Sequence, residues 1–476
     1  MRPSLRLILP AFVLTLGLGL ATNSFGQSQA PATDPEAAAA LSSANAGYSR
    51  VAPIAVDASQ PIQLTLGSSV VLDAETGAVV GAAVGQGNAN SNGIASAARE
   101  GNDGDEVFPD ARPNLPTIAG LDTVATFDGA FFAQAGPNST GLRLFRFTMM
   151  GNDPQGGETT LIPAPIDEVS LTLLNADGSV FKTVPFAPFE DVTLDSPNFE
   201  EHDYRSGRGL QYADAIHRAQ FFHTMARDWH TILRPRVVNR VTLTVPRFVN
   251  VRLANGNIIH ARSYFTGTAP DGSTFVLMLN LLFNFFFDNV VVNDIVAGNF
   301  TTRGLNMTLF PNTYLFSLNV NNPNTPGGCC VLGFHTFFFD PSTVPQARWI
   351  TQYASWISPG IFGGGFQDVA ALSHETSEAF GDPFLDNATP SWQFPNQPAT
   401  SHACQANLEE GDPIEVLPTA TIPIKLRERN EVFTYHPQII PLLQWFEMGA
   451  KSDAVDGAFS FPDETALPHS ALPCPQ

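Results

Sequence analysis

Alternating apolar and polar positions recur between residues 115 and 200 and predict β-strands. In residues 141–150 and 169–174 the apolar side chains fall on every second position, and turn-forming residues follow each run. Over residues 115–200 this pattern predicts a small antiparallel sheet. Residues 62–66 alternate in the same way and could supply a few short strands.

Helical spacing begins in residues 211–233, where apolar side chains recur every three or four positions. Several apolar runs after this segment predict further strands, and residues 287–296 fit a helix or a strand, with a helix preferred. We expect another helix over residues 366–380, because Gly381 and Pro383 are placed to end it.

The helix expected over residues 366–380 contains the run His374-Glu375-Thr376-Ser377-Glu378. His374 and Glu378 are one turn apart on one face, so their side chains can converge on a cation. Glu375 holds the position at which zinc peptidases place a general base beside the water bound to the metal. The alternative to a metal site is an ordinary helix end, with polar side chains one turn apart that bind no ion.

Glu378 stands where the zinc peptidase motif has a second histidine. One histidine and two carboxylates form a harder, more anionic site than two histidines and one carboxylate. Such a site lowers the preference for zinc and admits calcium or manganese. We therefore expect a divalent metal, with zinc first and calcium or manganese as alternatives.

The composition indicates a globular chain with an acidic surface. Of 476 residues, 43% are hydrophobic and 14% are charged, which is enough apolar material for a large core. The net charge of -21, from 24 basic and 45 acidic residues, argues against nucleic acid or an anionic membrane as a partner. We find no nucleophile elbow, no phosphate loop and, beyond the N-terminal apolar run, no dinucleotide fingerprint.

The N-terminus has the pattern of a secretory signal peptide. Arg2 and Arg6 precede an apolar run over residues 7–21, and small residues follow up to Gly26. The alternative is an uncleaved anchor, but the run is shorter than the roughly 20 residues that span a bilayer. We expect a signal peptide over residues 1–26, no transmembrane segment after cleavage, and a secreted, periplasmic or cell-surface protein.

Low-complexity composition marks the segment after the signal peptide. Residues 27–114 are rich in Ala, Gly, Ser, Asn and Asp, and read as a leader and linker with short strands. A β-rich region over 115–200 and a larger domain over 201–476 would follow.

Four cysteines in an exported chain indicate disulfides, with three possible pairings. Adjacent cysteines rarely bond to each other, because the bridge geometry is strained. We predict that one of Cys329 and Cys330 pairs with Cys404; the fourth cysteine is Cys474.

Two stretches, residues 373–384 and 404–413, resemble motifs of a family of exported bacterial proteins of uncharacterised function. The motifs are Ser-His-Glu-x-x-Glu-x-x-x-Asp-Pro and Asn-Leu-Glu-x-Gly-Asp. The stretches are more distantly similar to the exordium (phosphate-induced) proteins of plants, and the likeness extends from about Phe147 to Trp445. Both groups look like zincins. The resemblance therefore implies an α+β fold, with a zincin-like metallopeptidase-type domain (201–476) that has a mixed sheet and an active-site helix, after a small β-rich region.

The resemblance also implies roles for individual residues. His374 and Glu378 would be metal ligands, and Glu375 would be the catalytic base. Glu409 and Asp412 would supply the third ligand and its support. Three further residues are reserve candidates: Asp382, His335 and His436.

From these observations we expect an exported metal-dependent hydrolase of zincin type, a metallopeptidase-like protein in which Glu375 activates a metal-bound water. The expected substrate is a peptide or protein, the expected state is a monomer, and no nucleic-acid partner is expected. The first alternative is a catalytically inactive zincin-like extracellular binding or structural protein. The second is an adhesin or wall-associated protein without a metal.

Overall fold

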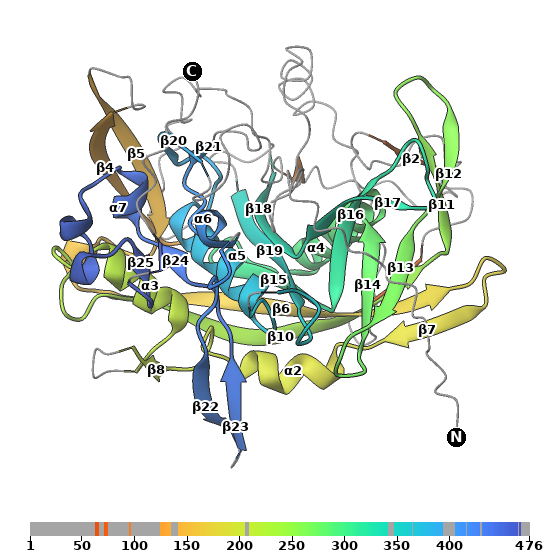
Figure 1. Ribbon diagram of the computed structural model, residues 1–476, viewed down its shortest axis with the longest axis horizontal. Coiled ribbons are helices and arrows are strands. Elements are labelled where there is room, and N and C mark those ends of the chain that lie inside the picture. Colours follow the sequence, from red (N-terminus) through yellow and green to blue (C-terminus); the bar gives the residue numbers. More distant parts are fainter. Residues whose placement is uncertain are drawn as a thin grey trace, which may run out of the picture.

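The computed structural model describes most of the chain from residue 124 onward and three short segments before it (Figure 1). The described residues are 62–65, 71–74, 95–96, 124–134, 141–204, 209–340, 347–363, 365–393, 405–415, 417–428, 431–464 and 466–467. The signal peptide expected over 1–26 and most of the leader expected over 27–114 lie outside these residues.

One eight-stranded sheet runs through the molecule and curls into a half-barrel (Figure 1). Five neighbouring strands in it are parallel: β1 (Ile62–Thr65), β10 (His230–Val245), β6 (Thr159–Leu174), β15 (Leu305–Pro311) and β19 (Ala347–Trp356). Three more strands pair antiparallel to their neighbours: β18 (Gly333–Asp340) with β19, β3 (Ala95–Ser96) with β18, and β7 (Val180–Val184) with β6.

The predicted α+β, zincin-like fold is wrong. The described part of the chain is mostly β, with 46% of its residues in strands and 20% in helices, and its main sheet is a curled half-barrel. The helix expected over 211–233 is one source of the error. Helix α3 (Tyr212–Gln220) covers only the first part of that segment, and residues 230–233 belong to β10. Strand β6 pairs in parallel with β10, so residues on both sides of the expected boundary at 200 share one sheet.

Prolines lie inside the two longest strands, β6 and β10, and weaken the strand pattern of their sequences. A proline has no N–H to donate, so it argues against a central strand. In the described chain, however, β1 pairs only with residues 241–244 of β10, so Pro235 lies where β10 has a single neighbour. Residues 234–236 of β10, Arg-Pro-Arg, are exposed. Pro163 and Pro165 of β6 likewise precede the three residues that pair with β15.

Helices cover both faces of the main sheet, and alternate strand residues point to opposite sides. Helix α4 (Asn280–Ala297) packs on one face, where Phe283 and Phe287 contact Phe334 of β18. Helix α5 (Ala370–Gly381) packs on the other face. The segment 287–296, for which a helix was preferred, is the second half of α4.

The remaining elements are smaller. A four-stranded sheet contains β13 (Tyr264–Thr268), β14 (Thr274–Leu279), β16 (Thr313–Leu318) and β17 (Pro326–Val331), and a three-stranded sheet contains β12 (Ile258–Arg262), β11 (Phe248–Arg252) and β2 (Val71–Asp73). The two-stranded pairs are β4–β5 (Thr126–Gln134, Leu142–Met150), β8–β9 (His202–Asp203, Gly209–Leu210), β20–β21 (Ala388–Trp392, Gln405–Asn407), β22–β23 (Ile424–Glu428, Glu431–Tyr435) and β24–β25 (Ile440–Pro441, Ser460–Phe461). The short helices are α2 (Ala187–Leu194), α6 (Asp412–Glu415) and α7 (Leu443–Phe446). None of the described helices is both long and apolar enough to cross a lipid bilayer.

The cysteine pairing differs from the prediction. Cys329 and Cys330 form a disulfide with each other in β17, and the expected bridge to Cys404 is therefore wrong. The prediction relied on the general strain of adjacent cysteines. The pairing of β17 with β16 is irregular around these residues, with register shifts on both sides of Phe316, so regular strand geometry does not apply here. Cys404 and Cys474 lie outside the described residues.

Candidate metal centre

Helix α5 lies buried against β18 and β19, and every residue from Ala370 to Gly381 is buried. Small side chains allow this close packing. The hydroxyls of Ser373 and Ser377 donate to main-chain oxygens one turn earlier, at 2.9 and 2.8 Å, so these polar groups are satisfied within the helix. The helix starts four residues later than predicted, because Asp368 has a φ of 45°, in the left-handed region.

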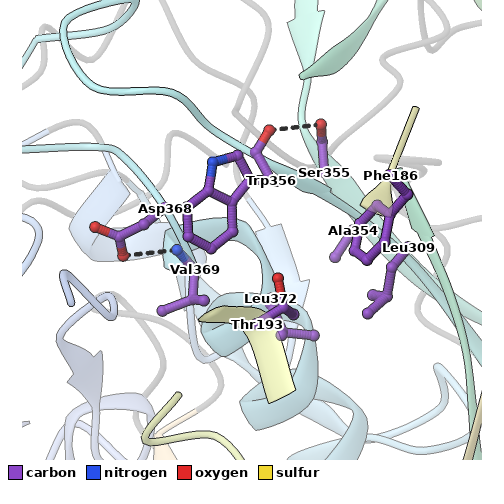
Figure 2. A pocket seen from close by; sticks show the side chains of 9 residues that line it. All are labelled: Phe186, Thr193, Leu309, Ala354, Ser355, Trp356, Asp368, Val369 and Leu372. Atoms are coloured by element: carbon purple, nitrogen blue, oxygen red, sulfur yellow. Dashed lines mark hydrogen bonds between the residues drawn. The ribbon is translucent and has the colours of Figure 1, made fainter. Parts of the chain in front are cut away.

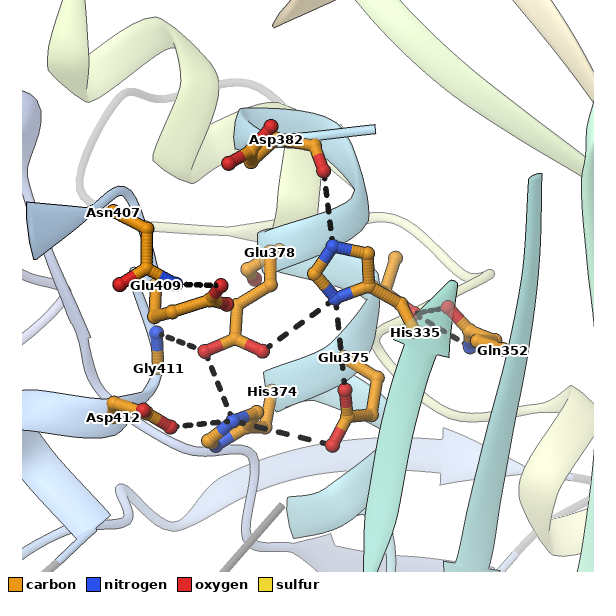
Figure 3. Close-up of polar contacts among 12 residues, drawn as sticks. His335, Gln352, His374, Glu375, Glu378, Asp382, Asn407, Glu409, Gly411 and Asp412 are labelled. Atoms are coloured by element: carbon orange, nitrogen blue, oxygen red, sulfur yellow. Dashed lines mark hydrogen bonds and ion pairs between the residues drawn. The ribbon is translucent and has the colours of Figure 1, made fainter. Parts of the chain in front are cut away.

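The first cluster of candidate ligands joins α5 to the start of α6. His374 Nε2 lies 3.0 Å from Glu378 Oε1 and 3.5 Å from Asp412 Oδ1. The three ligand atoms all lie within 4.8 Å of one another, and all three residues are buried (Figure 3). His374 and Glu378 converge because they are one helical turn apart. We call this set the His374 cluster.

A second cluster lies on the other side of Glu378 and includes a residue from the sheet. His335 of β18 points at α5, with its Nδ1 atom 3.7 Å from Glu378 Oε2 and 3.9 Å from Glu375 Oε2 (Figure 3). These three residues also offer ligand atoms within 4.8 Å of one another. We call them the His335 cluster. Glu378 belongs to both clusters, one carboxylate oxygen facing each histidine.

Each histidine is oriented by the ring nitrogen that faces away from the carboxylates. His374 Nδ1 lies 2.9 Å from the side-chain oxygen of Gln438, and His335 Nε2 lies 3.0 Å from the main-chain oxygen of Asp382. Both oxygens only accept hydrogen bonds, so these two nitrogens carry the proton and donate it. In the neutral ring the other nitrogen then points a lone pair at the carboxylates, which is the usual arrangement of histidines that bind metals.

The residues of the His374 cluster fit a divalent cation. In the described part of the chain, His374 Nε2 is buried and makes no hydrogen bond of normal geometry, although two carboxylate oxygens lie close by. Ligand atoms that surround one ion tetrahedrally at about 2.1 Å are roughly 3.4 Å apart. The separations of 3.0 and 3.5 Å match this spacing. The donor set of one imidazole and two carboxylates suits zinc or manganese.

Two glycines allow the segments around the clusters to approach closely. The main-chain N–H of Gly411 donates to Glu378 Oε1 at 2.9 Å, and a Cβ atom at Gly411 would lie 2.6 Å from the His374 ring. A Cβ atom at Gly333, at the start of β18, would lie 2.5 Å from Glu375 Oε1. A contact this short forces a neighbour to shift, so glycine at these two positions lets the His374 ring and the Glu375 carboxylate lie where they do.

When no cation lies between them, the carboxylates favour the protonated form of His374, and His374 favours the ionised form of Glu378. Burial alone lowers the pKa of His374, but the neighbouring charges of Glu378 and Glu375 outweigh it and raise the pKa well above its usual value. Burial raises the pKa of Glu378, yet the charge of His374 and the hydrogen bond to His335 bring it down to about 2. In contrast, burial raises the pKa of Glu410 well above its usual value, which favours the neutral form of this neighbouring carboxyl.

The structure brings together four of the residues predicted as site residues: His374, Glu375, Glu378 and Asp412. Glu409 belongs to neither cluster, and its Oε1 atom accepts a hydrogen bond of 2.6 Å from Asn407. Asp412, rather than Glu409, is therefore the third candidate ligand in the His374 cluster.

The three reserve candidates have different roles. The main-chain oxygen of Asp382 orients His335, and its carboxylate accepts hydrogen bonds from the main-chain N–H groups of residues 386 and 387. His436 pairs with Asp368 at 2.7 Å, at the N-terminal end of α5. His335 is the reserve candidate that reaches a cluster.

Sequence reasoning named His335 only as a reserve candidate and did not select Gln438. In residues 333–340, Phe334 and Phe338 point at α4, so the alternation places His335 on the opposite face of a phenylalanine-rich strand. That position is a usable signal for a buried functional histidine. Gln438 has no such signal, because it lies in an irregular segment and reaches His374 only through the fold.

The clusters are closed to solvent in this conformation. His335 is fully buried, and His374, Glu375, Glu378 and Asp412 are at most 2% exposed. A small pocket beside the N-terminal half of α5, between the helix and β15 and β19, does not include them (Figure 2). It is lined by Phe186, Thr193, Leu309, Ala354, Ser355, Trp356, Asp368, Val369 and Leu372. Metal sites closed in this way are typical of structural centres, whereas catalytic sites keep an open position.

No family model, curated protein or solved structure is significantly similar to this chain. The resemblance to exported bacterial proteins and to exordium proteins thus stays a prediction.

Proposed function

We propose that this protein is an exported metalloprotein in which a divalent cation, held by His374, Glu378 and Asp412, joins α5 to segment 405–415. The observation that carries the proposal is the orientation of His374. Its Nδ1 atom is held by Gln438, and its Nε2 atom points at two carboxylates without a hydrogen bond of normal geometry in the described chain. The N-terminal pattern of residues 1–26 supports export.

A cation would stabilise the protein by compensating buried charge. Three carboxylates (Glu375, Glu378 and Asp412) lie together with at most 1% exposure each. Taking several carboxylates out of water costs several kcal/mol unless positive charge compensates them, and a divalent cation supplies two such charges. A ligand that binds only the folded state adds to its stability by mass action. The cation would therefore act as a link between two segments that are distant in the sequence.

The test is metal analysis combined with thermal unfolding. The purified protein should contain at least one divalent ion per chain, and a strong chelator should lower its melting temperature. His374→Gln and Asp412→Asn should each lose the ion. Glu409→Gln is the matched control, because it also turns a buried carboxylate of the same segment into an amide, yet it should keep the ion. A folded protein without metal, unaffected by added Zn²⁺ or Mn²⁺, would contradict the proposal.

A metal-dependent hydrolase is the second candidate, and the position of Glu375 favours it. Glu375 Oε1 lies 4.0 Å from His374 Nε2, farther than the atoms proposed to bind the cation. A carboxylate at this position can accept a proton from water. The cation, when bound, would supply Lewis-acid stabilisation of negative charge.

Hydrolysis requires access to a site that is closed in the described conformation, so segment 405–415 would have to move away from α5. A screen against a broad peptide library would reveal an activity. Glu375→Gln should abolish that activity while the ion held by His374, Glu378 and Asp412 stays bound. If the metal-loaded parent hydrolyses no peptide, the proposal of a peptidase is contradicted, whereas the proposal of a metalloprotein is unaffected.

A further inference from the structure

We infer that the centre binds two divalent cations, with Glu378 as the bridging carboxylate between them. The inference rests on the proposed function, because it takes the ion in the His374 cluster as given. It adds a second ion in the His335 cluster, formed by His335, Glu375 and Glu378.

The first argument is the distribution of oxygen atoms. Glu378 turns Oε1 to His374, at 3.0 Å, and Oε2 to His335, at 3.7 Å. Glu375 is arranged in the same sense, with Oε1 4.0 Å from His374 Nε2 and Oε2 3.9 Å from His335 Nδ1. Two carboxylates thus lie between two imidazoles, one oxygen towards each. This is the arrangement in which carboxylates bridge a pair of ions.

The second argument excludes one ion shared by both histidines. Two ligand atoms of one ion, each about 2.1 Å from it, can be no more than about 4.2 Å apart. An ion bound to both histidines and to Glu378 would bring all three ligand atoms within that distance. Among the described residues, no set of three or more ligand atoms within 4.8 Å of one another contains both histidines. Each imidazole therefore needs its own ion.

The third argument is the orientation of His335. Its Nε2 atom donates to the main-chain oxygen of Asp382, so its Nδ1 atom is directed at the carboxylates. A buried histidine must donate its N–H to some acceptor, and here the position of that acceptor leaves Nδ1 facing Glu375 and Glu378. His374 is oriented in the same way, because its Nδ1 atom donates to the side-chain oxygen of Gln438.

Charge balance agrees with two ions. Three carboxylates contribute -3, and two neutral imidazoles contribute nothing. One divalent cation leaves a net charge of -1 (-3 + 2) in a fully buried site, and two leave +1 (-3 + 4), which one hydroxide or one further anion neutralises. The donors, two imidazoles and three carboxylates, suit Mn²⁺ or Zn²⁺ more than soft ions such as Cu⁺.

The test uses the full chain, freed of metal by a chelator and then titrated with Mn²⁺. Calorimetry should give two bound ions per chain. Electron paramagnetic resonance should show exchange coupling between them, because two Mn²⁺ ions bridged by a carboxylate are close enough to interact. His335→Gln should bind one ion and lose the coupling. His260→Gln, which changes an exposed histidine of β12, is the matched control and should behave as the parent.

Each contrary outcome has a distinct meaning. One uncoupled ion in the parent, unchanged in His335→Gln, overturns the second site and leaves the metalloprotein proposal intact. Two ions without coupling place the second elsewhere on this acidic chain and also overturn it. No bound ion contradicts both proposals. If His335→Gln does not fold, Glu375→Gln serves instead. We expect this variant to bind the second ion at least tenfold more weakly and to show no exchange coupling. Affinity and coupling equal to those of the parent would overturn the inference.

Discussion

The Nδ1 atom of His374 lies 2.9 Å from the side-chain oxygen of Gln438, which a different part of the chain supplies. Gln438 is itself held at both ends. Its main-chain N–H donates to the Ser373 hydroxyl at 2.8 Å, and its side-chain amide donates to the main-chain oxygen of Gly411. One glutamine therefore connects α5, the loop before α6 and the segment after β23.

Replacing Gln438 should weaken metal binding although Gln438 is not a ligand. Gln438→Met keeps the volume but removes the acceptor for His374 Nδ1, so the ring loses its fixed direction. We expect metal affinity to fall about 10- to 100-fold. Competition with a chromophoric chelator measures this. Gln444→Met, which removes a hydrogen bond to the main-chain oxygen of Gln220 away from the centre, should keep the parent affinity. Equal affinities in both variants would contradict the role of Gln438.

The close approach at Gly411 predicts a second effect. In Gly411→Ala the new methyl group would lie 2.6 Å from the His374 ring, so the ring or the loop must shift. We expect a loss of about 1–3 kcal/mol in the free energy of unfolding, as for other overpacked sites, together with weaker metal binding. Gly363→Ala is the control, because nothing lies within 4 Å of its added Cβ atom. Chemical denaturation and metal titration of both variants decide the point.

The buried carboxyl of Asp167 predicts an unusual dependence of stability on pH. Burial, and then the charge of Asp294, raise the pKa of Asp167 well above its usual value of about 4. The folded state therefore holds a proton that the unfolded state releases, and this contribution to stability falls as the pH rises above about 4. Asp167→Asn needs no proton.

We expect Asp167→Asn to be more stable than the parent by roughly 1–3 kcal/mol near pH 8, with the difference closing near pH 4. Urea unfolding at the two pH values measures it. The control is Asp177→Asn, at a fully solvated turn where hydrogen bonds to Ser179 lower the pKa, and it should show no gain at the higher pH. A difference for Asp167→Asn that does not change with pH would argue against a protonated Asp167.

The packing of α4 on the sheet can be tested through Phe283. This side chain is fully buried, and its ring lies 4.5 Å from the ring of Tyr353 and 6.0 Å from that of Phe334, measured between centroids. Phe283→Ala should destabilise the protein by about 3–5 kcal/mol in chemical denaturation. Phe132→Ala, at a side chain that is 67% exposed, should change stability by less than about 0.5 kcal/mol. Similar losses in the two variants would mean that α4 does not pack as described.

The local features of the centre were readable from the sequence because they depend on short spacings. Two side chains four residues apart on a helix meet on one face in any fold, so His374 and Glu378 could be paired in advance. The choice between Glu409 and Asp412 could not be made, since it depends on how segment 405–415 docks on α5. His335 lies 39 residues before His374 in the chain, and only the sheet brings it to the helix.

The fold was predicted less well, and the reason lies in long-range pairing. The strand pattern of residues 169–174 was correct, but whether β6 finds a parallel or an antiparallel neighbour depends on β10, more than 50 residues later. The motif on α5 also biased the prediction, because a short helical sequence can be placed on a half-barrel sheet as well as in a zincin.

The run Arg234-Pro235-Arg236 in β10 has a consequence for the behaviour of the protein in solution. A strand with one neighbour exposes a row of donors and acceptors to which another chain can add. Among the described residues β10 has a single neighbour at this stretch, which has a proline, without a donor, between two positive charges that repel a second copy of the same stretch. Sheet growth from molecule to molecule is thus blocked at this edge, and concentrated protein should resist fibre formation there.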